Sequence, residues 1–244
     1  SFGLIDLEDM EKLAMNGFRE PIVRLPYLLS LFRRLLKRFD FEEIDAFLGV
    51  DFNVFNFLIE GRLKRKGIPT AHYVSPSVYA WRPGRVEKIA KSTDLLLCLF
   101  PFEPKFYDGV SIDVRFVGHP LADEIPSDVN PLRAKTEARD SLNLCDEGKV
   151  VALLPGSRRG EIFYMLDTFL RTAEIVKREL TDVRFIIPCV NEEILCKVDD
   201  YLKKKKGLQV VTYLGNANTA LLACDVVLTK SGTSTLEASL LKRP

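Results

Sequence analysis

The sequence predicts an α/β protein in which helices cover parallel sheets. Short apolar runs rich in β-branched residues alternate with helical patterns along almost the whole chain, as in successive βαβ units. Most of these runs are apolar at consecutive positions, which is typical of strands buried on both faces of a parallel sheet. The 244 residues are enough for one large domain or two ordinary ones.

Each expected element follows from its local pattern of apolar residues and stop signals. The helical patterns 54–66 and 192–206 stop at Gly67 and Gly207, with lysines in their last turns, as a left-handed cap and the helix dipole favour. In chain order, the expected strands are 46–50, 70–74, 95–99, 114–117, 150–154, 184–189, 209–214 and 226–229. The expected helices are 21–39, 54–66, 83–90, 161–180, 192–206, 217–223 and 234–241.

The polar stretch 123–142, which contains two prolines, predicts a boundary between two α/β units. The expected domains are residues 1–130 and residues 131–244. The chain begins without a Met and stops directly after a helical pattern. We therefore expect a piece of a longer protein, with both units incomplete.

Composition excludes several classes of protein. The 35 Lys and Arg residues balance 34 Asp and Glu, so the net charge of +1 gives no reason to expect a nucleic-acid partner. The 5 cysteines are widely spaced and the histidines number only 2, which argues against a metal site or a disulfide scaffold and favours a reducing compartment. No signal peptide or membrane-spanning run is visible.

Residues 153–161 form the first candidate phosphate-binding turn. An apolar run leads into Gly156, Ser157 and Arg158, and a helix begins near Glu161. Such a turn leaves backbone N–H groups free at a helix N-terminus, and Arg158 adds a forked cation, which together suit a phosphate or diphosphate. The motif is neither a Walker loop nor GxGxxG, and a tight βα turn with solvated arginines explains it equally well.

Residues 229–237 repeat this arrangement of strand, small-residue loop and helix. Ser231, Gly232 and Thr233 can offer hydroxyl and amide donors to a phosphate, and Glu237 can accept a hydrogen bond from a sugar hydroxyl. Ser234 with Glu237 also fits a capping box, which explains the glutamate without a ligand. Two such turns at neighbouring strand ends favour a cleft for a nucleoside diphosphate.

A carboxylate ends the first expected strand. Asp51 follows the apolar run directly, at the edge where ligands of parallel sheets bind, and it can serve as a general base there. The alternative is an aspartate that caps the helix beginning near Asn53. The loop after the next strand contains Ser75, Trp81 and Arg82 and predicts either a sugar-contact surface or a loop packed over the sheet edge.

Residues 21–39 combine an apolar helical stripe with basic residues. Ile22, Leu25, Leu28 and Leu29 begin the stripe, and 5 arginines or lysines lie beside it. The pattern alone favours a core helix with a solvated basic face, and the alternative is a helix that lies on an anionic membrane surface.

Several blocks of the sequence resemble the lipid-A-disaccharide synthase family. They are HYVSPSVYAWRPGRVEKIAK (72–91), LFPFE (99–103), RFVGHPLAD (115–123), LLPGSRRGEI (153–162) and SGTSTLEASLLKRP (231–244). The resemblance implies a glycosyltransferase of the GT-B type, in which two Rossmann-like units face each other across a cleft.

The resemblance also implies a reaction and its partners. The family transfers 2,3-diacylglucosamine from UDP to the 6-hydroxyl of 2,3-diacylglucosamine 1-phosphate, with inversion and release of UDP. It uses no metal or other cofactor and acts in the cytoplasm at the anionic surface of the inner membrane, as a peripheral protein. A homodimer is the candidate assembly, with the N-terminal unit on the acceptor and membrane side and the C-terminal unit binding the UDP-sugar.

Residue roles carried over from the family fall on both units. Asp51 matches the acidic residue that acts as base, and Arg158 matches the arginine of the PGSR turn. The matching substrate-binding residues are Gly156, Ser157, Glu161, Ser231, Gly232, Thr233, Glu237, Ser75, Trp81 and Arg82. The chain departs from the family pattern at Val54, where a second acid is usual, and at Tyr79, where Trp is usual. Segments of the family beyond both ends are missing, so the intact parent is the expected active form.

Overall fold

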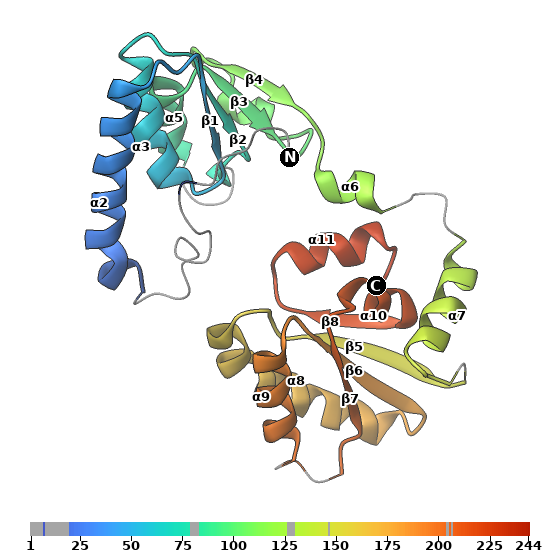
Figure 1. The fold of residues 1–244 in the computed structure, drawn as a ribbon. Coiled ribbons are helices and arrows are strands. Elements are labelled where there is room, and N and C mark those ends of the chain that lie inside the picture. Colours follow the sequence, from blue (N-terminus) through green and yellow to red (C-terminus); the bar gives the residue numbers. More distant parts are fainter. Residues whose placement is uncertain are drawn as a thin grey trace. The chain divides into compact units, whose positions relative to one another are not determined.

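The computed structural model describes residues 7, 20–78, 83–125, 130–145, 147–203, 205 and 207–244. It divides into two compact units, one at Phe18–Pro120 and one at Leu121–Pro244. Each unit contains its own parallel sheet, and the two are described separately (Figure 1).

The first unit is built on a four-stranded sheet in sequential order, β1-β2-β3-β4. Its strands are β1 (Phe47–Val50), β2 (Thr70–Tyr73), β3 (Leu95–Cys98) and β4 (Asp113–Phe116). Its helices are α2 (Glu20–Phe41), α3 (Asn53–Lys64) and α5 (Val86–Ser92), with 3-10 turns η1 (Pro83–Arg85) and η2 (Pro104–Tyr107). The core lies between sheet and helices, where Ile59 and Leu63 of α3 and Leu96 of β3 are at most 1% exposed.

The second unit has a four-stranded parallel sheet of order β7-β6-β5-β8. Its strands are β5 (Lys149–Leu154), β6 (Val183–Cys189), β7 (Val210–Leu214) and β8 (Val226–Thr229). Its helices are α7 (Pro131–Ser141), α8 (Arg159–Glu179), α9 (Glu192–Leu202), α10 (Ala217–Ala223) and α11 (Thr233–Leu240), and α6 (Pro120–Glu124) lies at the junction of the units.

Strand alternation places a core on each face of this second sheet. Val150, Ala152 and Leu154 of β5 belong to a cluster with residues of α7, α10 and α11. Leu153 points the other way and packs with α8 and α9. The expectation of a parallel sheet covered on both faces is therefore confirmed in this unit.

In the first unit, the same expectation is wrong for the edge strand β1. Leu48 and Val50 point to one face, and each is 55% exposed. Gly49 points to the opposite face, which α3 covers, and it is buried. A strand at the edge of a sheet has fewer neighbours to cover it, and a run of apolar letters does not reveal that position.

All eight expected strands are present, each within one residue of its predicted bounds, and the α/β class is confirmed. The expected helices are present too, although α9 ends at Leu202 rather than near residue 206. The stretch 123–142, where we expect the boundary between the two units, also contains helix α7, which the sequence analysis did not predict. Asn130 caps α7 by accepting from the N–H groups of Leu132 and Arg133, and Pro131 takes the first helical position.

Candidate functional site

The strand order of the second unit creates a crevice beside β5. From β5 the chain moves to β6 and β7 on one side, and then returns to place β8 on the other side of β5. Leu154 and Thr229, the last residues of β5 and β8, lie side by side in register. The two connections leave this point in opposite directions, which is where open α/β sheets bind ligands.

A cavity of about 530 Å³ lies at this switch point, within the usual range of small-molecule sites. Seven sequence-predicted residues line it: Gly156, Ser157, Arg158, Glu161, Gly232, Thr233 and Glu237. Ser231 is exposed and is not among its lining residues. The lining also includes Lys230 and Asn216, which the sequence reasoning missed although each directly follows a strand end or its turn.

Glu161 occupies the donors of the first turn. Its Oε2 accepts hydrogen bonds from the backbone N–H of Ser157 at 3.0 Å and of Arg158 at 3.3 Å. Lys230 Nζ donates to its Oε1 at 2.7 Å. Partial burial opposes ionisation, but these hydrogen bonds outweigh it and hold the pKa of Glu161 below its usual range. The expectation that these N–H groups are free is therefore wrong, because a carboxylate of the same chain binds them.

Gly156 makes this arrangement sterically feasible. Its φ is +141°, which side chains rarely allow, and a Cβ there would lie 2.5 Å from Glu161 Cβ. The glycine of the turn thus serves both the backbone conformation and the close approach of the glutamate.

The second turn is capped differently from the sequence expectation. Helix α11 begins at Thr233, and its first turn closes through Thr235, whose Oγ1 accepts from the Gly232 N–H at 3.1 Å. Ser234 instead bonds Thr229 Oγ1 at 2.7 Å. The capping box of Ser234 with Glu237 is therefore wrong, and Glu237 lines the cavity.

In the first unit, Asp51 ends β1 in a left-handed conformation, with φ +46°. Its N–H donates to Tyr73 O at 2.9 Å, and Asn56 Nδ2 donates to its carbonyl at 2.7 Å. The side chain is exposed and lines a cavity of about 750 Å³ with Ser75 and others. Phe52, not Asp51, is the N-cap of α3, so the helix-cap alternative for Asp51 is wrong.

The loop after β2 is only partly described. Ser75 lines the cavity of Asp51, but it is 7% exposed and its Oγ lies 2.9 Å from Tyr107 Oη. Burial raises the pKa of Tyr107 to about 12, so this phenol is neutral at physiological pH. Trp81 and Arg82, the other predicted contacts of this loop, lie outside the described residues.

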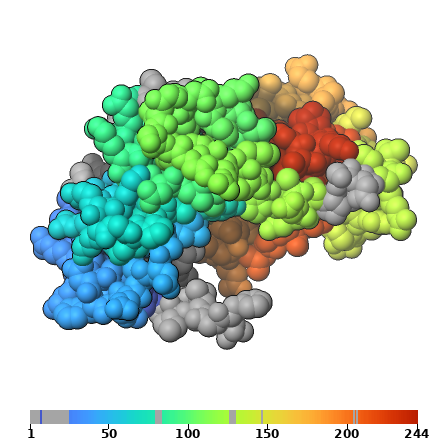
Figure 2. Space-filling model, turned by 90° about the horizontal axis from the view of Figure 1, so that it is seen from above, coloured from blue at the N-terminus to red at the C-terminus, as the bar shows by residue number. Residues whose placement is uncertain are grey.

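Helix α2 has both a packed face and exposed apolar residues. Leu31 is 4% exposed, and Phe32 packs edge-on against Phe55 of α3. Leu25 and Leu29 are exposed by 52% and 46%, and Leu28 is half-buried. The side chain of Ile22 lies outside the described residues. Figure 2 shows the atoms of α2, in blue, on the outer surface of their unit.

The described residues offer neither a metal site nor a membrane-spanning helix. In the described ranges, no group of three His, Cys, Asp or Glu side chains could hold a metal ion. Nor is any described helix both long and apolar enough to cross a bilayer.

Several solved structures have a similar fold. A UDP co-structure of MnaA from S. aureus aligns with a TM-score of 0.59 and 15% identity, over 89% of this chain and 60% of that one. UDP-GlcNAc 2-epimerase from Neisseria meningitidis, bound to UDP-GlcNAc, aligns with a TM-score of 0.59 and 14% identity, over 89% and 62%. The fold and the turn-lined strand ends place this chain in the GT-B class of α/β proteins.

The chain belongs to the lipid-A-disaccharide synthetase family, whose model matches residues 2–244. It is 44% identical to the lipid-A-disaccharide synthase of Saccharophagus degradans, over 100% of this chain and 62% of that protein. It is 43% identical to that of Chromobacterium violaceum, over 99% and 62%. The family resemblance seen in the sequence is confirmed, and the chain spans somewhat less than two thirds of these relatives.

Proposed function

We propose that the protein containing this chain is an inverting glycosyltransferase of lipid A biosynthesis. It would move 2,3-diacylglucosamine from UDP to the 6-hydroxyl of 2,3-diacylglucosamine 1-phosphate, giving the disaccharide 1-phosphate and UDP. The observation that carries the proposal is the family match along the whole chain. The cavity at the β5–β8 switch point, lined by both candidate phosphate-binding turns, supports it independently.

The bond changes of this reaction assign one role to each unit. The 6-hydroxyl oxygen attacks the anomeric carbon, the bond from that carbon to the diphosphate oxygen breaks, and its electron pair leaves with UDP. Asp51 takes the hydroxyl proton. Arg158 and the N–H groups near it stabilise the charge that grows on the diphosphate.

Binding of a diphosphate at the first turn requires Glu161 to leave the backbone N–H groups that it occupies. A diphosphate oxygen bound by the N–H groups of Ser157 and Arg158 would replace the Glu161 carboxylate there. Lys230, which pairs with Glu161 beside this turn, would then bind the diphosphate instead of the carboxylate.

The acylated substrates explain the exposed apolar residues of the first unit. A protein that takes acylated sugars from a bilayer must reach its surface, and Leu25 and Leu29 on α2 would enter the acyl boundary. We place the protein on the cytoplasmic face of the inner membrane, with residues 20–120 on the acceptor side and residues 121–244 holding the UDP-sugar.

The test is a reaction of the intact protein with UDP-2,3-diacylglucosamine and 2,3-diacylglucosamine 1-phosphate, followed by chromatography for disaccharide and UDP. Formation of both products in equal amounts supports the proposal. UDP-sugar binding without turnover would instead show a silent binding protein, and turnover of the UDP-sugar without disaccharide would show a different enzyme of this fold. Sedimentation velocity of the same sample tests the candidate homodimer.

A further inference from the structure

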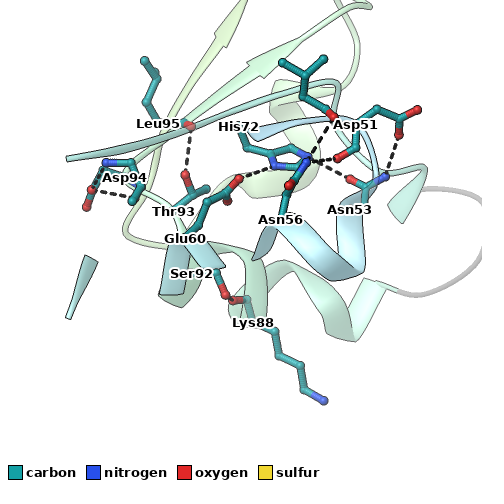
Figure 3. Close-up of polar contacts among 12 residues, drawn as sticks. Asp51, Asn53, Asn56, Glu60, His72, Lys88, Ser92, Thr93, Asp94 and Leu95 are labelled. Carbon is teal, nitrogen blue, oxygen red and sulfur yellow. Dashed lines mark hydrogen bonds and ion pairs between the residues drawn. The ribbon is translucent and has the colours of Figure 1, made fainter. Parts of the chain in front are cut away.

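A chain of polar contacts runs from the core of the first unit to Asp51 (Figure 3). Glu60 Oε1 lies 2.7 Å from His72 Nδ1. His72 Nε2 lies 3.0 Å from Asn53 Oδ1, and Asn53 Nδ2 lies 3.4 Å from Asp51 Oδ1. The chain thus links a glutamate of α3 and a histidine of β2 to the carboxylate at the end of β1.

The inner pair is fully buried, which is costly for two titratable groups. Glu60 and His72 are both 0% exposed, and Phe57 stacks on the imidazole with ring centroids 4.1 Å apart. A Cβ on Gly49 would lie 2.1 Å from Glu60 Oε1, so the glycine of β1 leaves the space that the pair fills. Burying such groups is unfavourable unless they are hydrogen-bonded, and an apolar pair would pack there without that requirement.

The chemistry of each group gives the contacts one direction. Asp51 ionised can only accept, so the Asn53 amide presents its NH₂ to Asp51 and its oxygen to His72. That oxygen can only accept, so His72 Nε2 carries a proton and donates it to the hydrogen bond. Glu60 Oε1 contacts the other ring nitrogen, Nδ1, so the glutamate and Asn53 hold opposite edges of the imidazole.

We propose that Glu60 and His72 are positioning residues for Asp51, acting through Asn53. The buried pair fixes the tautomer and ring orientation of His72, His72 fixes the amide of Asn53, and Asn53 holds the Asp51 carboxylate toward the cavity that it lines. Asn56, which donates to the Asp51 carbonyl, holds the backbone of the same residue. This inference rests on the proposed role of Asp51 as the base.

The competing explanation is that the pair only joins α3 to β2. The two explanations differ in what a variant changes. Loss of a structural pair lowers stability and the amount of folded protein, whereas loss of a positioning pair lowers kcat of the folded protein and leaves KM nearly unchanged. Misplacement of a reacting group costs up to about 100-fold in rate.

The experiment compares kcat, KM and melting temperature of the intact enzyme and four variants. His72→Leu and Asn53→Ala are expected to lower kcat about 10- to 100-fold with KM within about twofold of wild type. His72→Gln, whose amide N–H can replace Nε2–H, is expected to recover most of kcat. Leu96→Ala removes a side chain that is 0% exposed in the same core, and it is expected to lower the melting temperature without lowering kcat.

A double variant separates action through Asn53 from a general effect. His72→Leu added to Asn53→Ala is expected to lower kcat no further than Asn53→Ala alone. Additive losses, or a normal kcat in Asn53→Ala, would overturn the inference. Asn53→Ala leaves the buried pair intact, so the result stands even where His72→Leu does not fold. An inactive wild type would refute the proposed function itself, whereas an active wild type with an inactive Asp51→Asn and unaffected Asn53→Ala would refute only this inference.

Discussion

Asp51 and Phe52 both adopt left-handed backbone conformations, with φ of +46° and +42°. Non-glycine residues rarely do so, and each such position costs on the order of 1 kcal/mol. The hydrogen bonds from the Asp51 N–H to β2 and from Asn56 to the Asp51 carbonyl offset that cost. As a result, Asp51 lies in a turn just after β1, and its side chain is exposed at the sheet edge.

Asp51→Asn is expected to lower turnover of the intact enzyme by about 10²–10⁴-fold, because an amide cannot take the hydroxyl proton. Binding of the UDP-sugar should change little, since Asp51 and the β5–β8 cavity belong to different units. Steady-state kinetics and calorimetric binding measure the two effects. Asp108→Asn, at an exposed aspartate of the same unit, is the control, and near-normal turnover of Asp51→Asn would refute the base assignment.

Arg158→Lys tests the cation of the first turn. Arg158 is exposed at the start of α8 and lines the cavity. Its planar fork can bind two diphosphate oxygens, which an ammonium cannot reproduce, so the loss should fall on kcat more than on affinity for UDP. Arg159→Lys at the neighbouring position is the matched control. Full activity of Arg158→Lys would reduce Arg158 to a general surface charge.

Among the helices, α2 has both buried and exposed residues in the apolar stripe that the sequence predicted. Leu31 packs inward, whereas Leu25 and Leu29 remain exposed. The interpretations as membrane helix and as core helix therefore apply to different residues of the same helix, and the helix offers its own control.

Leu25→Ser with Leu29→Ser is expected to weaken binding of the protein to anionic vesicles while leaving its melting temperature nearly unchanged. Each apolar side chain that leaves water contributes roughly 1.5–3 kcal/mol to membrane binding. Leu31→Ala should do the opposite, lowering stability by about 2–5 kcal/mol. Vesicle co-sedimentation and thermal melts measure both. A large fall in melting temperature for the Leu25 and Leu29 variant would show that these residues stabilise the fold, and it would contradict the membrane assignment.

Helix α7 is held to the second sheet by charged side chains that are buried or partly buried. Asp225 accepts from Lys135 at 2.5 Å, from Arg139 at 2.9 Å and from the Val150 N–H at 2.8 Å. Burial opposes ionisation of Asp225, but these contacts outweigh it and lower its pKa. Arg139 is 3% exposed, so the carboxylate balances a cation that water hardly reaches.

Asp225→Asn is expected to cost about 1.5–3 kcal/mol of unfolding free energy at pH 7, because it weakens the charge-assisted hydrogen bonds from Arg139 and Lys135. The folded pKa lies below the unfolded value, so this stabilisation is complete above about pH 4 and is lost as pH falls through the folded pKa. Urea denaturation at pH 7 and at pH 3 measures the difference. Asp113→Asn, in an exposed pair with Arg115, should change stability little at either pH. A gap independent of pH would contradict the ion-pair explanation.

At the scale of the whole molecule, the two units have different sheet orders and different candidate roles. Only the second sheet contains a switch point among the described strands, and its cavity draws on residues of that unit alone. A nucleotide bound there should therefore stabilise the second unit and leave the first unit largely unchanged.

UDP is expected to slow amide hydrogen exchange in the turns at 154–161 and 229–237 and to leave β1 and β2 unchanged. At about 100 times its Kd, a ligand stabilises the state that binds it by about 2.7 kcal/mol. Exchange of this chain with and without UDP, read by mass spectrometry, measures the effect. Protection confined to β1 and β2 would contradict the assignment of the UDP-sugar to residues 121–244.

The amino-acid sequence was enough to predict the α/β class, the eight strands, the two glycine-containing turns and the family. These features depend on short apolar runs, stop signals and contiguous motifs, which lie within a few residues of one another. Helix α7 could also have been predicted, because Asn130 and Pro131 are ordinary helix start signals. Its polar composition, without a clear apolar stripe, is the reason it was missed.

Which polar groups contact one another could be seen only in the folded chain. Glu161 with Lys230, Ser75 with Tyr107 and Glu60 with His72 are separated by 69, 32 and 12 residues in the chain. It also decided that Leu31 is buried while Leu25 and Leu29 are exposed on the same helix. The physical reason is that burial and hydrogen-bond partners are set by strand order and by which face each helix covers, and a local pattern contains neither.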